Sequence, residues 1–152
     1  MGARIAIDAS VIVRYLTGDE KTQSAAAADL FRAAQAGKVS LAIPTPTIQE
    51  TVYVLERLYG LDAETIAPKL ISLLAMPNVF APDARWLAEA LQHYRTKNSD
   101  FGDALLCAYA REEGWDVATF DKGLIKKFPE VSACTPAEWL SRTTQQKDKG
   151  PN

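Results

Sequence analysis

Two aspartates that end β-prone runs are the residues of this chain best placed to do chemistry. Asp8 follows Ile5-Ala6-Ile7, and Asp121 follows the run from Trp115 to Phe120. Aspartate is disfavoured in strands and costly to bury within a sheet. Both residues therefore indicate a site rather than a structural role.

Three further acids lie at expected helix starts. Asp100 and Asp103 open an apolar stretch that runs to Ala110, and Glu50 is expected in the first turn of a helix from Thr47 to Leu58. Helix starts accept acidic residues for capping alone, so Asp100 is explained equally well as an N-cap. Asp103 faces an apolar helix and fits a structural role least well.

The elements that must position these acids alternate along the chain. Gly37, Gly60 and Gly114 are expected to end helices, and β-prone runs stand between the helical stretches. The segment 11–13 suits either a strand or a helix start. The expected strands are 5–7, 39–43, 78–80, 115–120 and 131–134, and the expected helices are 22–36, 47–58, 62–75, 83–94, 100–113, 122–127 and 136–140.

This alternation predicts an α/β fold with a mostly parallel sheet of about five strands and helices on both faces. Side chains beyond the carboxyl ends of parallel strands line the binding crevice of such sheets. We therefore expect Asp8, Glu50, Asp100, Asp103 and Asp121 to lie at one edge of the sheet.

Clustered carboxylates repel one another, and a divalent cation removes that conflict. Oxygen donors without nearby histidine or cysteine favour Mg²⁺ or Mn²⁺. Such an ion would polarise a phosphodiester and activate water for its hydrolysis. Ser10 and Thr119 are candidates to position a water or a phosphate oxygen, whereas the single histidine, His93, is expected far from this edge.

Composition restricts the class of protein. The chain has 152 residues, a net charge of −2 and a pI near 5.4, so any nucleic-acid binding must come from a local basic patch, a metal ion or a partner. Two cysteines are too few for a disulfide scaffold. No signal peptide or membrane span is predicted, so we expect a cytoplasmic protein with one domain over residues 1–140 and a disordered tail over 141–152.

Four segments in order make the chain resemble the PIN-domain family, and within it the VapC toxins of toxin–antitoxin pairs. They are residues 5–11 (IAIDASV), 45–55 (TPTIQETVYVL), 100–110 (DFGDALLCAYA) and 117–122 (VATFDK). The resemblance covers residues 4 to about 140. It implies a three-layer α/β/α fold and a Mg²⁺- or Mn²⁺-dependent ribonuclease that cuts single-stranded RNA.

The resemblance also implies roles for particular residues. The acidic quartet of the family falls on Asp8, Glu50, Asp103 and Asp121, with Asp100 as a frequent extra acid and Asp8 and Asp103 as the main metal ligands. Ser10 and Thr119 fall on the small polar positions of the family. Relatives in toxin–antitoxin pairs are commonly homodimers inhibited by an antitoxin, so a second copy and an antitoxin are the implied protein partners.

Two other interpretations stay open. The chain could be a metal- or RNA-binding module without turnover, although its intact acids argue against that. It could also be a phosphotransfer enzyme with Asp8 as nucleophile, but that chemistry usually needs an aspartate where Ser10 stands. Lys122, Arg14 and Lys97 are the basic residues expected nearest the acids.

Overall fold

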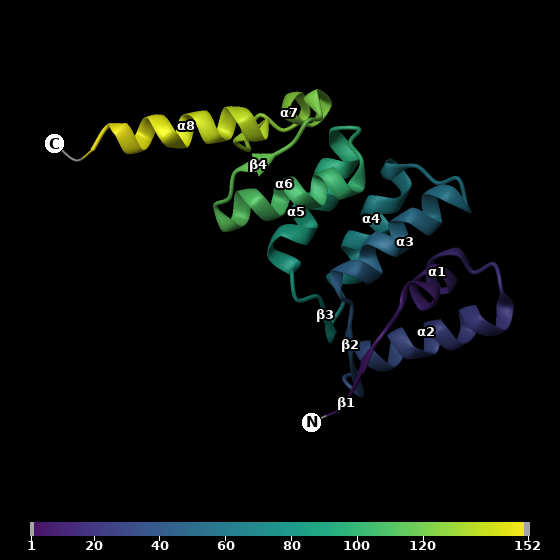
Figure 1. Cartoon of the computed structure of the whole chain (residues 1–152). Helices are drawn as coiled ribbons and strands as arrows, with labels where there is room; N and C mark the ends of the chain where they lie inside the picture. The colour runs from purple at the N-terminus through teal and green to yellow at the C-terminus, as the bar shows by residue number, and fades with distance from the viewer. Residues whose placement is uncertain (1, 151–152) are drawn as a thin grey trace.

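A computed structural model describes residues 2–150 of the chain, with helices and strands alternating along most of it (Figure 1). The elements are β1 (Ala3–Ala6), α1 (Ala9–Thr17), α2 (Lys21–Gln35), β2 (Val39–Ala42), α3 (Thr45–Arg57), α4 (Ala63–Leu74), β3 (Val79–Phe80), α5 (Ala84–Thr96), α6 (Phe101–Glu113), β4 (Val117–Ala118), α7 (Lys122–Lys127), β5 (Ala133–Cys134) and α8 (Pro136–Asp148).

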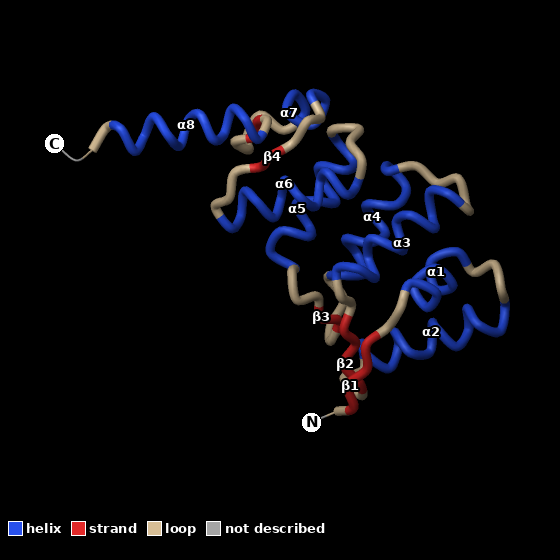
Figure 2. The backbone as a smooth tube through the Cα atoms, in the orientation of Figure 1, coloured by secondary structure: helices blue, strands red, loops and turns tan. Residues whose placement is uncertain are grey.

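The predicted α/β class and the parallel strands are confirmed, but the strands form two sheets instead of one. β1, β2 and β3 pair in that order, with Ile5 beside Leu41 and Leu41 beside Val79. β4 and β5 form a separate parallel pair, with Val117 beside Ala133. Figure 2 shows the two sheets far apart, with helices between them.

Helix packing explains this separation. Small buried residues of α6, among them Ala104 and Ala108, let α6 pack closely against α5. The rings of Tyr94 and Phe101 meet edge to face at the same junction, 5.4 Å apart. Because β4 follows α6 directly, this packing holds β4 and β5 away from β1.

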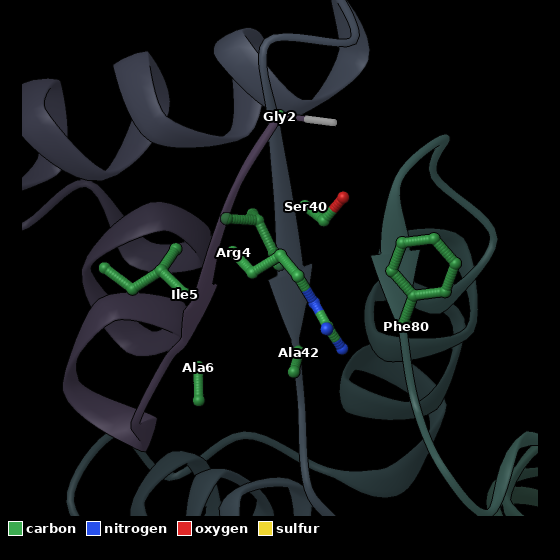
Figure 3. A pocket seen from close by; sticks show the side chains of 8 residues that line it. Gly2, Arg4, Ile5, Ala6, Ser40, Ala42 and Phe80 are labelled. Carbon is green, nitrogen blue, oxygen red and sulfur yellow. The ribbon is translucent and has the colours of Figure 1, made fainter.

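The two faces of the three-stranded sheet differ. Leu41 and Val79 are buried on one face, within the hydrophobic core. The other face carries Arg4, Ser40 and Phe80, and it borders a hollow of about 610 Å³ (Figure 3). We call this second face the open sheet face; it consists of Arg4, Ala6, Ser40, Ala42 and Phe80.

The segment 11–13, which suited either a strand or a helix start, belongs to helix α1, because Asp8 caps that helix soon after β1. Two local predictions need correction. Helix α3 begins at Thr45, since Pro44 is its N-cap and Pro46 is tolerated in a first turn. Glu50 therefore lies in the second turn of α3 and not in the first.

The second correction concerns the expected tail. Residues 141–148 continue helix α8, and residues 151–152 of the expected tail lie outside the described residues. The hydroxyl of Thr135 caps this helix by accepting from Glu138 N–H, and Pro136 stands at its first position. Glutamine, lysine and arginine favour helix even without burial. Low hydrophobicity therefore leaves this segment exposed without unfolding it.

Candidate active site

The first group of candidate residues surrounds the end of β1. Asp8 is the N-cap of α1, and its Oδ1 atom accepts from Ser10 N at 2.9 Å and from Ser10 Oγ at 2.6 Å. The hydrogen bond from the Ser10 hydroxyl is the main reason that the pKa of Asp8 lies below its usual value. Asp8 therefore stays ionised and holds the Ser10 hydroxyl in place.

Glu50 belongs to this first group through a shared hollow. It lines a cavity of about 200 Å³ together with Ser10 and Arg14. Arg14, one of the expected phosphate-binding residues, lies 3.0 Å from Asp19 and also donates to the hydroxyl of Tyr59. The guanidinium is thus already paired at the side of this cavity.

The second group consists of Asp100, Asp103 and Asp121, which we call the acidic trio. Asp100 caps α6 and Asp121 caps α7, each accepting two backbone N–H groups through Oδ1. Burial raises the pKa of Asp103, and the negative charges of Asp100 and Asp121 raise it further. The carboxylates of Asp100 and Asp121 are therefore close enough to Asp103 to interact with it electrostatically.

Two glycines make room for the capping carboxylates of the trio. A Cβ atom at Gly102 would lie 2.9 Å from Asp100 Oδ1, and one at Gly123 would lie 3.0 Å from Asp121 Oδ1. Each capping aspartate is thus followed two residues later by a glycine. This repeated Asp-Xaa-Gly spacing is a signal in the sequence itself, at positions 100–102 and 121–123, that marks both capping carboxylates.

The start of helix α3 lies between the two groups. The Thr47 hydroxyl donates to the carbonyl of Ile7, the residue before Asp8, at 3.2 Å. On the other side, Gln49 Nε2 lies 3.7 Å from where a Cβ of Gly102 would be. Glu50, the next residue along α3, therefore stands on the helix whose first turns contact the surroundings of both Asp8 and the trio.

The five predicted acids are divided between these groups. Within residues 2–150, no three histidine, cysteine, aspartate or glutamate side chains are gathered closely enough to hold a metal ion. The donor types nevertheless suit a hard divalent cation, because they are all carboxylate oxygens. The hydrogen bonds that Asp8, Asp100 and Asp121 accept all end on Oδ1, which leaves each Oδ2 available.

The remaining candidate residues take structural positions around these groups. Thr119 Oγ1 accepts from the backbone N–H of Asp121 at 3.0 Å, so it orients the trio. His93 lies near Glu89 and Glu130, with N···O distances of 3.7 and 3.8 Å. Lys127 is a residue that the sequence does not single out, because nothing there distinguishes it from Lys126. In the structure its positive charge acts on Asp103 and partly opposes the rise in the pKa of that carboxyl.

Parallel strands followed by helices that begin at aspartates define an α/β protein with an acidic site at its helix starts. A PIN-domain family profile matches residues 5–130, and the chain belongs to the PIN-domain family. Proteins of this family are generally metal-dependent nucleases. A comparison with curated proteins found no match. None of the helices within residues 2–150 is long and apolar enough to cross a membrane.

Proposed function

We propose that this chain is a metal-dependent endoribonuclease that hydrolyses phosphodiester bonds in single-stranded RNA. The observation that carries the proposal is the acidic trio, in which burial and two neighbouring charges raise the pKa of Asp103. A nuclease of the PIN family needs such an excess of carboxylate charge, because the excess draws a cation to the place where a phosphate must be cut.

The proposed cation is Mg²⁺ or Mn²⁺. The residues that would hold it are Asp8, Glu50, Asp103 and Asp121, with Asp100 beside them. When bound, it would polarise the phosphodiester and make water a stronger nucleophile. The available Oδ2 atoms of the capping aspartates support this assignment, since a carboxylate can cap a helix with one oxygen and bind a cation with the other.

Ser10 and Thr119 have supporting roles in this proposal. The Ser10 hydroxyl donates to Asp8, and the Thr119 hydroxyl accepts from the N–H of Asp121. The first contact restricts the rotation of the Asp8 carboxylate, and the second fixes the backbone of Asp121. We therefore assign them to orienting these carboxylates, with water or phosphate as a further contact of the hydroxyls.

We further propose that the enzyme is the toxin of a cytoplasmic toxin–antitoxin pair, that it forms a homodimer and that an antitoxin inhibits it. The open sheet face supports a protein contact, because Phe80 is 57% exposed there beside Ala6 and Ala42. Edge strands such as β1 also have unpaired backbone groups that a second chain can use. We assign the open sheet face to the second copy of this chain.

The alternative function is a metal- or RNA-binding PIN module without turnover. One observation favours this alternative: within residues 2–150 no three acidic side chains are gathered closely enough to hold a metal ion, and a catalytic centre needs them to act together. The two interpretations differ in a simple way: a binding module would retain RNA but leave it intact in the presence of Mg²⁺ or Mn²⁺.

The experiment is a cleavage assay on total RNA with Mg²⁺, Mn²⁺ or EDTA, using antitoxin-free wild type and Asp103→Asn. We expect cleavage only with a metal ion, and a loss of at least about 100-fold in the variant. Asp62→Asn is the matched control, because Asp62 caps α4 outside both acidic groups and asparagine caps equally well. Binding of RNA without cleavage under every metal condition would favour the alternative.

A further inference from the structure

Two lysines tie together the segments that carry the acidic trio. Lys97 Nζ donates to the carbonyl of Lys127 at 2.9 Å, and Lys127 Nζ donates back to the carbonyl of Asn98 at 2.8 Å. Lys97 and Asn98 belong to the turn between α5 and α6, shortly before the cap Asp100, whereas Lys127 ends α7. The reciprocal bonds therefore fix the end of α7 against the start of α6.

The two lysines differ in how many N–H donors of the ammonium group are already used. Lys97 also donates to Glu130 at 2.7 Å and lies over the ring of Phe128 at 4.9 Å, and its side chain is only 24% exposed. Its ammonium is thus occupied on several sides. Lys97 acts as a positioning residue, because its contacts hold the turn that follows α7.

The side chain of Lys127 is exposed, and its ammonium makes a single hydrogen bond, to the carbonyl of Asn98. A lysine ammonium has three N–H donors, so two of them point to no partner within residues 2–150. Its positive charge also acts on Asp103, where it opposes the increase in pKa that Asp100 and Asp121 cause. An exposed cation with free donors thus stands near Asp103, the central acid of the trio.

This position matters because an RNA strand is itself an anion. The chain carries a net charge of −2, and the trio adds local repulsion against any phosphate that approaches. A cation fixed next to the carboxylates would offset that repulsion and hold a phosphate where the acids act. An ammonium binds a phosphate oxygen as a point charge, without reading the base.

We propose that Lys127 binds a backbone phosphate of single-stranded RNA at the acidic trio, with Lys97 and Asn98 fixing the position of its ammonium. The inference rests on the proposed function and names one residue that recognises its substrate. The expected contact is independent of sequence, because every nucleotide presents the same phosphate.

The test is equilibrium binding of a fluorescently labelled oligouridylate in EDTA over a range of salt concentrations. Each phosphate contact to a single strand contributes about 0.7 to the slope of log affinity against log salt, which is a factor of about 5 at 0.1 M salt. We expect Lys127→Met to lower affinity by about that factor and to reduce the slope by about 0.7. Lys127→Arg should keep the wild-type slope.

Lys126→Met is the matched control, because Lys126 is also exposed, at the adjacent position of α7. It should change neither affinity nor slope. A loss of affinity in Lys127→Met with an unchanged slope would assign Lys127 a structural role and overturn the inference. Wild type that fails to bind the oligouridylate at low salt would instead contradict the proposed function, and the inference with it.

Discussion

The carboxylate of Asp100 occupies space that a Cβ atom at position 102 would need, since the two atoms would lie 2.9 Å apart. Asp100 uses that space to cap α6 through the N–H groups of Gly102 and Asp103. The cap and the glycine are thus one structural unit. It sets where the first acid of the trio lies.

A double-mutant cycle tests this unit. Alanine at position 102 gains up to about 1 kcal/mol of helix propensity, but beside Asp100 it disturbs a cap worth about 1 kcal/mol. We expect Gly102→Ala to leave the unfolding free energy nearly unchanged in wild type and to raise it by up to about 1 kcal/mol in the Asp100→Ala background. Equal effects of Gly102→Ala in both backgrounds, measured by urea denaturation, would show that the two residues are independent.

Substitutions of Asp100 separate capping from metal binding. Asparagine caps about as well as aspartate, so Asp100→Asn should keep the unfolding free energy within about 0.5 kcal/mol. Asp100→Ala should lose about 1 kcal/mol. If Asp100 contributes its charge to the proposed metal site, RNA cleavage falls in both variants. Full cleavage by the stable Asp100→Asn protein would leave Asp100 with the capping role alone.

The raised pKa of Asp103 predicts a dependence of stability on pH. Because folding raises this pKa, the protonated form is favoured in the folded state, and its contribution to stability is lost as pH rises through the folded-state pKa. Asp103→Asn should therefore melt at a higher temperature than wild type at pH 7. The difference should disappear below the usual aspartate pKa of 3.8.

At pH 7, millimolar Mg²⁺ or Mn²⁺ should raise the melting temperature of wild type above that of Asp103→Asn. The reason is that a cation that binds the folded state stabilises wild type and not the variant. Thermal melts with and without EDTA provide the measurement. If neither ion changes the melting temperature of wild type, that result would count against the metal site, whatever the cleavage activity.

Tyr94 joins α5 to α3 by donating its hydroxyl to the carboxylate of Glu56. Burial and this carboxylate raise the pKa of Tyr94, so the hydroxyl remains a donor throughout the physiological range. Tyr94→Phe should lose about 1–2 kcal/mol of unfolding free energy in chemical denaturation. Tyr53→Phe is the control: Tyr53 is 61% exposed, and its loss should stay within about 0.5 kcal/mol. Equal losses of unfolding free energy in Tyr94→Phe and Tyr53→Phe would show that the Tyr94–Glu56 hydrogen bond does not stabilise the contact between α5 and α3.

The proposed dimer predicts that Phe80→Ser shifts the protein toward a monomer, because it removes the largest apolar side chain of the open sheet face. Light scattering with size-exclusion chromatography measures the mass. Phe120→Ser is the control, since Phe120 is 83% exposed but lies outside that face. A dimer that survives Phe80→Ser, or dissociates equally in Phe120→Ser, would exclude this surface as the interface.

The sequence alone determined what depends on neighbouring residues. Asp62 and Asp100 cap helices as their positions predict, because capping joins groups only two or three residues apart. Five β-prone runs contain strands, and glycines end helices where a left-handed conformation is needed, as at Gly114. The family followed from four short segments in order, and the match over residues 5–130 confirms it.

Tertiary structure decided what depends on distant residues. Whether β1 and β4 share a sheet is a matter of how α6 packs on α5, and no local pattern of hydrophobic residues encodes that choice. The sequence suggested one edge for all five acids, and within residues 2–150 no three of them are gathered closely enough to hold a metal ion. Lys127 is the clearest example. In the sequence it is an ordinary lysine, and its proposed role depends on Asn98 and Asp103, which only folding brings near it.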